Sequence, residues 1–107
     1  MARIFNQEEN DFLTKNLLTG VKQAWIGGHY LPVISRNQTF QGWYWLDQDN
    51  LSASVPVIYE NWKSGRPYND PENSWIGIFG DQGNSQNGNL PGLWTDFGLW
   101  IPNLGSC

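Results

Sequence analysis

Residues 61–80, NWKSGRPYNDPENSWIGIFG, hold the side chains of this sequence that are best suited to chemistry. Between a Gly-x-Pro turn and an apolar run stand the carboxylates and amides of Asn69, Asp70, Glu72 and Asn73. Side chains of these types can form a polar site, because their oxygens accept hydrogen bonds. The same residues beside Pro and Gly also cap turns by accepting hydrogen bonds from the local backbone. The residue types alone leave both interpretations open.

Signals for catalysis are weak. Glu72 and Asp96 could act as an acid and a base, as in glycosidases, but only their residue types suggest this role. His29, the single histidine, follows WIGG in an expected loop, and we interpret it as a surface or hydrogen-bonded residue. The sequence contains no nucleophile elbow, phosphate-binding loop or histidine-based metal motif. We therefore predict that the protein is not an enzyme.

The bulk composition limits the partners. A chain of 107 residues is long enough for one domain. Six Lys and Arg against ten Asp and Glu give a net charge of −4, which argues against binding to nucleic acid or to a membrane surface. No apolar run approaches the ~18 residues of a membrane span, so we expect no membrane insertion. The first residues do not read as a signal peptide, so export would depend on a signal outside this chain.

One segment, at about residues 7–18, is predicted to be a helix. Asn6 is a good N-cap, and Glu9 stands three residues later, as in a capping box. Gly20 can close the helix at its other end. The apolar stripe that should pack against the rest of the protein consists of Phe12, Leu13 and Leu17.

The remainder of the chain has the pattern of short strands. Aromatic or β-branched runs alternate with Gly, Pro and Asn, and these runs are AWIGG, GWYWLD, PVIYENW, SWIGIFG and GLWTDFG. Residues 80–92, GDQGNSQNGNLPG, predict a long turn or loop. One helix followed by strands predicts an α+β fold. The single cysteine, Cys107, excludes an internal disulfide framework, so packing must provide the stability.

The order of these motifs resembles that of the C-type lectin-like domain. The matching segments are NQEENDFL (6–13), WIGG (25–28), WYWLD (43–47), NWKSGRPYN (61–69), ENS (72–74) and WTD (94–96). The resemblance implies a single lectin-like domain over residues 1–107, with one helix, short antiparallel strands and a long irregular loop. It also implies that the family's first strand and helix and its last strand are missing, and that the chain is part of a larger protein. Ser74 replaces a family cysteine, as in a disulfide-free bacterial or environmental branch.

The resemblance carries a calcium site with it. In sugar-binding members, the long loop and the WND strand hold one calcium ion that also binds sugar hydroxyls. The five corresponding positions here are Arg66, Tyr68, Glu72, Thr95 and Asp96. Only Glu72 and Asp96 keep a carboxylate as a metal ligand, and the cation of Arg66 would repel calcium at close range. We therefore predict that the calcium-dependent mechanism is lost and that no cofactor is needed.

Two arrangements of the loop stay open. In the first, Arg66 forms an ion pair with Glu72 or Asp96, and this pair replaces the metal in fastening the loop. In the second, calcium binds in a rearranged site. The resemblance would bring together the oxygen ligands of that site, which are Asn69, Asp70, Glu72, Asn73 and Asp96.

The tryptophans also divide into two groups. By the resemblance, five are expected as core anchors, namely Trp25, Trp45, Trp62, Trp75 and Trp94. Trp43, Tyr68 and Trp100 have weaker structural reasons for being aromatic, and an exposed aromatic can stack on a sugar or contact a protein. Tyr68 in the loop is the best candidate for such a contact.

The function implied is a non-catalytic module that binds carbohydrate or protein through the long-loop face, in a secreted or cell-surface protein. The candidate ligand-binding residues are Arg66, Tyr68, Asn69, Asp70, Glu72, Asn73, Thr95 and Asp96. One alternative is a structural or interaction domain of a larger extracellular or adhesin-like protein. A glycan hydrolase is the other alternative.

Overall fold

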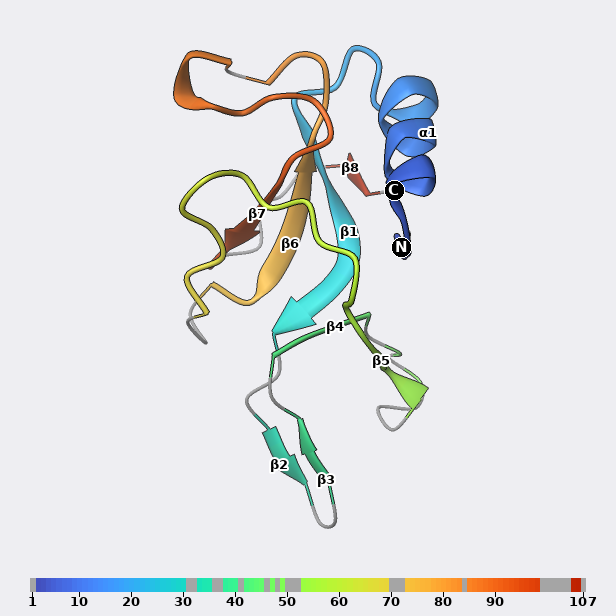
Figure 1. The fold of residues 1–107 in the computed structure, drawn as a ribbon, viewed down its shortest axis with the longest axis vertical. Helices are drawn as coiled ribbons and strands as arrows, with labels where there is room; N and C mark the ends of the chain where they lie inside the picture. The colour runs from blue at the N-terminus through green and yellow to red at the C-terminus, as the bar shows by residue number, and fades with distance from the viewer. Residues whose placement is uncertain are drawn as a thin grey trace.

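The computed structural model describes residues 2–30, 33–35, 38–40, 42–45, 47, 49, 53–69, 73–83, 85–98, 105 and 106. Within them, helix α1 lies beside a sheet whose strands stand in the order β5-β4-β1-β6-β7, all antiparallel (Figure 1). The strands of this sheet are β1 (Gln23–Tyr30), β4 (Trp43–Trp45), β5 (Val55–Pro56), β6 (Trp75–Phe79) and β7 (Trp94–Phe97). This arrangement confirms the predicted α+β fold.

Two smaller pairings complete the strands. β8 (Gly105–Ser106) pairs in parallel with the start of β1. β2 (Val33–Ser35) and β3 (Gln38–Phe40) form a hairpin that projects from one end of the molecule (Figure 1). The expectation that the family's terminal elements are missing stays a prediction.

Helix α1 (Gln7–Leu17) begins where the sequence predicts. The side chain of Asn6 accepts a hydrogen bond from the backbone N–H of Glu9 at 2.8 Å, and the Glu9 carboxylate accepts one from Phe5 N–H at 2.7 Å. The bond from Glu9 N–H satisfies a group that a helix start leaves without a partner, and the bond from Phe5 N–H fixes the residue before the N-cap. Among the described residues, no helix is long and apolar enough to cross a membrane.

The predicted apolar stripe of this helix is wrong in two of its three residues. Leu13 is buried, but Phe12 and Leu17 are 66% and 60% exposed. The face turned inward carries Asn10, three residues before Leu13 and 1% exposed, and Leu18, just after the helix, completes the contact. A buried asparagine is invisible to a hydrophobic pattern, so the pattern chose the wrong face.

β1 is the central strand of the sheet. Glycines in β1 and β6 let side chains of the next strand lie close to the backbone. A Cβ atom at Gly28 would overlap the side chain of Ile76, and one at Gly77 would overlap the ring of Phe97. The register between β1 and β6 shifts between Trp25 and His29. These two strands with β7 form the framework from which the candidate site is built.

The PVIYENW segment is not the strand that the sequence predicts. Of its seven residues, only Pro56 lies in β5 (Val55–Pro56), and Trp62 forms an isolated parallel bridge with Trp94. Pro56 has no N–H to donate to a ladder, which suits an edge position and limits further pairing. The irregular chain that follows becomes the start of the long loop.

Aromatic rings fill the core. Trp25, Trp45 and Trp94 are fully buried, which confirms three of the predicted anchors, whereas Trp62 and Trp75 are partly buried. The rings of Trp45 and Trp94 meet edge to face with centroids 5.8 Å apart. Such contacts add about 0.5–1.5 kcal/mol beyond the burial of area. Trp100 lies outside the described residues.

His29 lies in β1 and not in the predicted loop. Its Nδ1 is 2.6 Å from the carbonyl oxygen of Ser74, and its ring lies over Trp75 with centroids 4.2 Å apart. A hydrogen-bonded histidine was one of the two expected interpretations. Burial lowers the pKa of His29, and the hydrogen bond to the Ser74 carbonyl offsets part of this effect.

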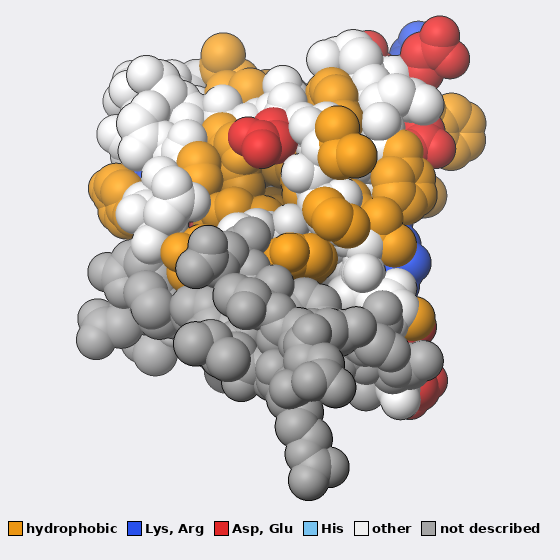
Figure 2. All heavy atoms as spheres, turned by 60° about the horizontal axis from the view of Figure 1, so that its bottom comes forward, with side chains coloured by type: hydrophobic (Ala, Val, Ile, Leu, Met, Phe, Trp, Pro, Cys, Tyr) orange, Lys and Arg blue, Asp and Glu red, His pale blue; other side chains and the backbone are white. Residues whose placement is uncertain are grey.

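Hydrophobic side chains also reach the surface. Figure 2 shows them on one face of the molecule, in groups separated by polar atoms. The large hydrophobic side chains that are most exposed are Phe5, Phe12, Leu17, Val55, Ile58, Tyr68 and Leu90. Because singly exposed apolar side chains are common, exposure alone does not mark a binding site.

Candidate functional site

The long loop is fixed against the start of β7 by backbone hydrogen bonds. Trp94 N–H donates to Asn61 O, and Lys63 N–H donates to Trp94 O, each at 2.8 Å. A turn then follows, in which Arg66 N–H donates to Lys63 O and Gly65 has a φ of +82°, which favours glycine. This path brings Arg66 opposite Asp96 of β7.

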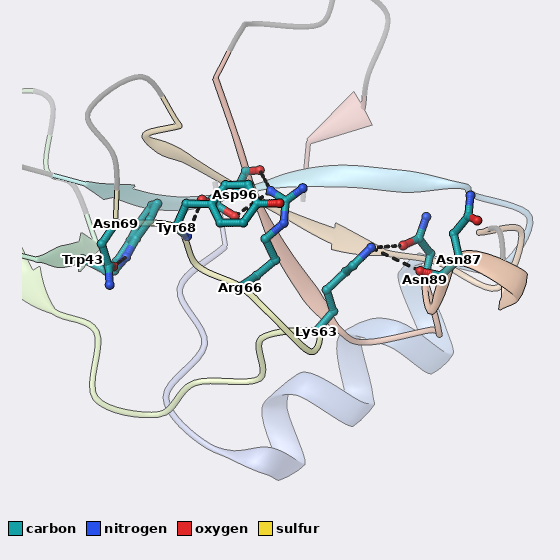
Figure 3. Close-up of polar contacts among 8 residues, drawn as sticks. All are labelled: Trp43, Lys63, Arg66, Tyr68, Asn69, Asn87, Asn89 and Asp96. Atoms are coloured by element: carbon teal, nitrogen blue, oxygen red, sulfur yellow. Dashed lines mark hydrogen bonds and ion pairs between the residues drawn. The ribbon is translucent and has the colours of Figure 1, made fainter.

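Arg66 and Asp96 form an ion pair whose carboxylate is buried and whose guanidinium is partly exposed (Figure 3). Nη1 of Arg66 donates to Oδ1 of Asp96 at 2.8 Å and to its backbone carbonyl at 2.9 Å. The second carboxylate oxygen, Oδ2, accepts a hydrogen bond from the backbone N–H of Tyr68 at 2.9 Å. The Asp96 side chain is fully buried, so its charge depends on these donors.

Tyr68 and Asn69 form the outer part of the loop. The guanidinium carbon of Arg66 lies 4.0 Å from the centroid of the Tyr68 ring, a cation–π contact, and Tyr68 is 60% exposed. Asn69 has a φ of 55°, a backbone conformation that asparagine tolerates. Its Oδ1 accepts a hydrogen bond from the indole Nε1 of Trp43 at 3.0 Å (Figure 3).

No protein-family model matches the sequence, and a search of curated proteins finds no relative. A solved structure, the mouse scavenger receptor C-type lectin carbohydrate-recognition domain, matches with a TM-score of 0.55 and 25% sequence identity. The match covers 91% of this chain and 58% of the other. The fold is that of a C-type lectin-like domain. This result confirms the family resemblance seen in the motifs.

The lectin-like fold brings together four of the predicted ligand-binding residues. Arg66, Tyr68 and Asp96 contact one another directly, and Asn69 follows Tyr68 in the chain and bonds to Trp43. Thr95 is buried, and because consecutive strand residues point to opposite faces, its side chain does not share the face of Asp96. Other predicted residues lie farther along the chain: Asn73 is partly buried just before β6, and Asp70 and Glu72 lie outside the described residues. The role of each as a ligand-binding residue stays a prediction.

The two open arrangements of the loop can now be compared. The geometry supplies the ion pair of Arg66 with Asp96. In the described part of the chain, no group of three or more acidic, histidine or cysteine side chains gathers as a metal site would require. The Asp96 side chain is fully buried and its carboxylate lies 2.8 Å from the Arg66 cation, so a calcium ion could bind there only if Arg66 moved away.

Two contacts of the lectin-like loop escape sequence reasoning. Lys63 Nζ donates to Asn89 Oδ1 at 2.8 Å and to Asn87 O at 3.3 Å, which ties the long loop to the loop of residues 80–92 (Figure 3). That loop contains the short 3-10 helix η2 (Ser85–Asn87). The sequence gives no signal for this pairing, because the partners are 24 and 26 residues apart.

Trp43 has a stronger structural role than the sequence suggested. It is 8% exposed and packs with Trp62, with ring centroids 5.0 Å apart, so it belongs to the core. The signal was present in the sequence, because Trp43 and Trp45 are two residues apart on a strand and share a face. Through its indole hydrogen bond to Asn69, Trp43 connects the long loop to the core.

Proposed function

We propose that this chain is a non-catalytic module that binds carbohydrate or protein through the loop surface of Arg66, Tyr68 and Asn69, without calcium. The observation that carries the proposal is the Tyr68 ring, which is 60% exposed and yet rests on a guanidinium anchored to a buried carboxylate. An aromatic side chain held in place before binding loses little freedom on contact with a ligand. Aromatic residues of this kind dominate many binding surfaces.

The connections of Asp96 support independence from calcium. The ion pair with Arg66 occupies the carboxylate that the family would give to the metal, and it fastens the loop to β7 in the same step. These bonds support a loop that protein groups can organise without a metal ion. The same bonds support a non-enzymatic role, because a general acid or base must be able to reach a proton of the substrate.

The similarity to a carbohydrate-recognition domain supports sugar as the first ligand class to test. We further propose a secreted or cell-surface location, as part of a larger protein. If no ligand binds to the loop surface, the alternative is a structural or interaction domain of such a protein.

The test is a glycan array probed with the 107-residue chain in calcium and in EDTA, followed by affinity measurement for the best ligand. We expect equal binding in both buffers and a loss of at least about tenfold for Tyr68→Ala, or about 1.4 kcal/mol. Phe12→Ala is the matched control, because this ring is 66% exposed on α1, away from the loop. Its affinity should stay within about twofold of the parent, a difference of roughly 0.4 kcal/mol.

Three outcomes would contradict the proposal. Binding that disappears in EDTA would restore the calcium mechanism. Equal losses for Tyr68→Ala and Phe12→Ala would place the ligand elsewhere or show a general effect on folding. Absence of any glycan or protein ligand would leave the structural domain as the explanation of the fold.

A further inference from the structure

Among the described residues at the loop surface, the side-chain acceptors of Asp96 and Asn69 are used inside the protein, and the Tyr68 hydroxyl is the side-chain acceptor left at the surface. Both oxygens of the Asp96 carboxylate and its backbone carbonyl accept hydrogen bonds from Arg66 and Tyr68. Oδ1 of Asn69 accepts the indole N–H of Trp43. An ionised carboxylate can only accept, and a side-chain amide has one acceptor oxygen, so these bonds direct the acceptors inward.

The donor groups of the same surface are used much less. Both side-chain hydrogen bonds of Arg66 to described residues come from Nη1, so Nε and Nη2 keep their N–H groups for other partners. The Arg66 side chain is 24% exposed, and Asn69 is exposed with an amide NH₂ that bonds to no other described residue. The surface therefore offers a permanent cation, amide N–H groups and one aromatic ring.

From this imbalance we propose that the ligand is an acidic carbohydrate, whose carboxylate pairs with Arg66 while its ring packs against Tyr68. This inference rests on the proposed function and names the ligand class for the same surface. A carboxylate presents two acceptor oxygens that match the planar fork of a guanidinium. A neutral sugar offers hydroxyls, which gain less from a donor surface that carries a charge.

A sugar acid suits the surface better than an acidic peptide does. It brings a ring and a carboxylate in one rigid unit, whereas an aspartate side chain supplies the charge without a ring to pack on Tyr68. The chain has a net charge of −4, so long-range attraction does not favour either anion. Selectivity must therefore come from short-range contacts with Arg66 and Tyr68.

The test compares ligands on an unchanged protein, so it does not depend on the folding of a variant. Glucose, glucuronate and a poly-aspartate peptide are titrated into the ¹⁵N-labelled chain, and amide and indole N–H signals are followed by NMR. The indole of Trp43 reports on the loop directly, because it donates to Asn69. We expect glucuronate to bind at least about tenfold more tightly than glucose, with shifts at Trp43, Tyr68 and Asn69.

A second arm tests the assignment to Arg66. Arg66→Lys keeps the charge but loses the planar fork, so we expect it to reduce the preference for glucuronate while the dispersed NMR spectrum shows a folded chain. Lys15→Ala on α1 is the control for the loss of a cation elsewhere and should leave the preference unchanged. Its position in the last turn of the helix is remote from the loop in sequence.

The outcomes separate the two proposals. Equal binding of glucose and glucuronate at the loop overturns the acidic ligand and keeps the proposed function. Stronger binding of poly-aspartate than of glucuronate overturns the sugar acid in favour of a protein ligand. Absence of loop shifts with all three probes overturns the acidic-sugar inference, and an empty glycan array beside it overturns the proposed function as well.

Discussion

Two buried polar side chains connect distant parts of this domain, and they do so with opposite chemistry. Asn10 of α1 is 1% exposed, donates to Gly92 O at 3.1 Å and accepts from the indole of Trp94 at 2.8 Å. Asp96 of β7 is also 1% exposed, but it is a carboxylate held by the Arg66 guanidinium and the Tyr68 N–H. One connection is neutral, and the other depends on a charge.

The difference separates the scaffold from the candidate site. Asn10 uses one donor and one acceptor on groups of the folded core, and nothing of this contact reaches solvent. Asp96 uses only acceptors, so its partners must be donors, and those donors belong to residues that extend to the surface. The ionic connection therefore leaves a donor-rich surface where the amide connection leaves none.

The largest expected effect comes from removing the charge partner of Asp96. Arg66→Met should lower the free energy of unfolding by about 3 kcal/mol, because a buried carboxylate without its cation is strongly unfavourable. Urea unfolding followed by tryptophan fluorescence gives this value, because the aromatic core reports on folding.

The double variant Arg66→Met, Asp96→Asn is the control for charge. It removes the buried anion together with its cation, so it should be more stable than Arg66→Met alone by at least about 1 kcal/mol. If the double variant were less stable than the single one, the ionic nature of this connection would not be the source of the effect.

The neutral connection should cost less to break. Asn10→Ala leaves the Trp94 indole N–H without its acceptor, and we expect a loss of about 2 kcal/mol in the free energy of unfolding. Gly92 O keeps a second donor, the amide of Asn61 at 2.7 Å, so only one buried group is affected.

Asn16→Ala is the matched control on the same helix. Its amide donates to Phe12 O on the exposed side, so the change should alter the free energy of unfolding by less than about 0.5 kcal/mol. Alanine favours the helix more than asparagine does, so helix propensity alone would stabilise both variants. Equal losses at positions 10 and 16 would therefore mean that the bond to Trp94 is not what makes Asn10→Ala costly.

These two connections also show what the sequence can and cannot predict. The helix start and the order of the elements follow from local patterns, because caps and short aromatic runs act over a few residues. The three buried tryptophans were expected as core anchors from the family resemblance. The pairing of Arg66 with Asp96 was one of two open arrangements, and only the motif order of a known family brought these residues together, 30 positions apart.

The misses have a shared physical cause. Asn10 and Trp94 are 84 positions apart, and a buried amide looks polar in a hydrophobicity pattern, so the pattern selected Phe12 and Leu17. The same reasoning placed His29 in a loop, because a polar residue beside two glycines resembles a turn. In both cases a partner that is distant in sequence satisfies the polar group.

His29 can be either neutral or charged, so a change in pH can turn a neutral buried group into a charged one. Its effect on stability can then be compared with those of Asn10 and Asp96. Since a carbonyl can only accept, Nδ1 must carry a proton and donate to Ser74 O, so the neutral ring behaves as Asn10 does. Burial lowers the pKa of His29 from its ordinary value of 6.5, so the unfolded chain takes up a proton before the folded one. The unfolded state then binds more protons below about pH 6.5, and the free energy of unfolding must fall as the pH decreases through that value.

The measurement is urea unfolding at several pH values between about 5.5 and 7.5, a range that spans the ordinary pKa of histidine, and His29 is the single histidine of the chain. The parent chain should lose stability toward pH 5.5, by less than the Asn10 or Arg66 variants lose at neutral pH. His29→Asn can keep a donor toward Ser74 and cannot gain a charge, so its stability should be flat in this window. If the free energy of unfolding of His29→Asn still changed with pH, the dependence would arise from another group. His29 would then act as a neutral hydrogen-bonded residue, as Asn10 does, throughout this pH range.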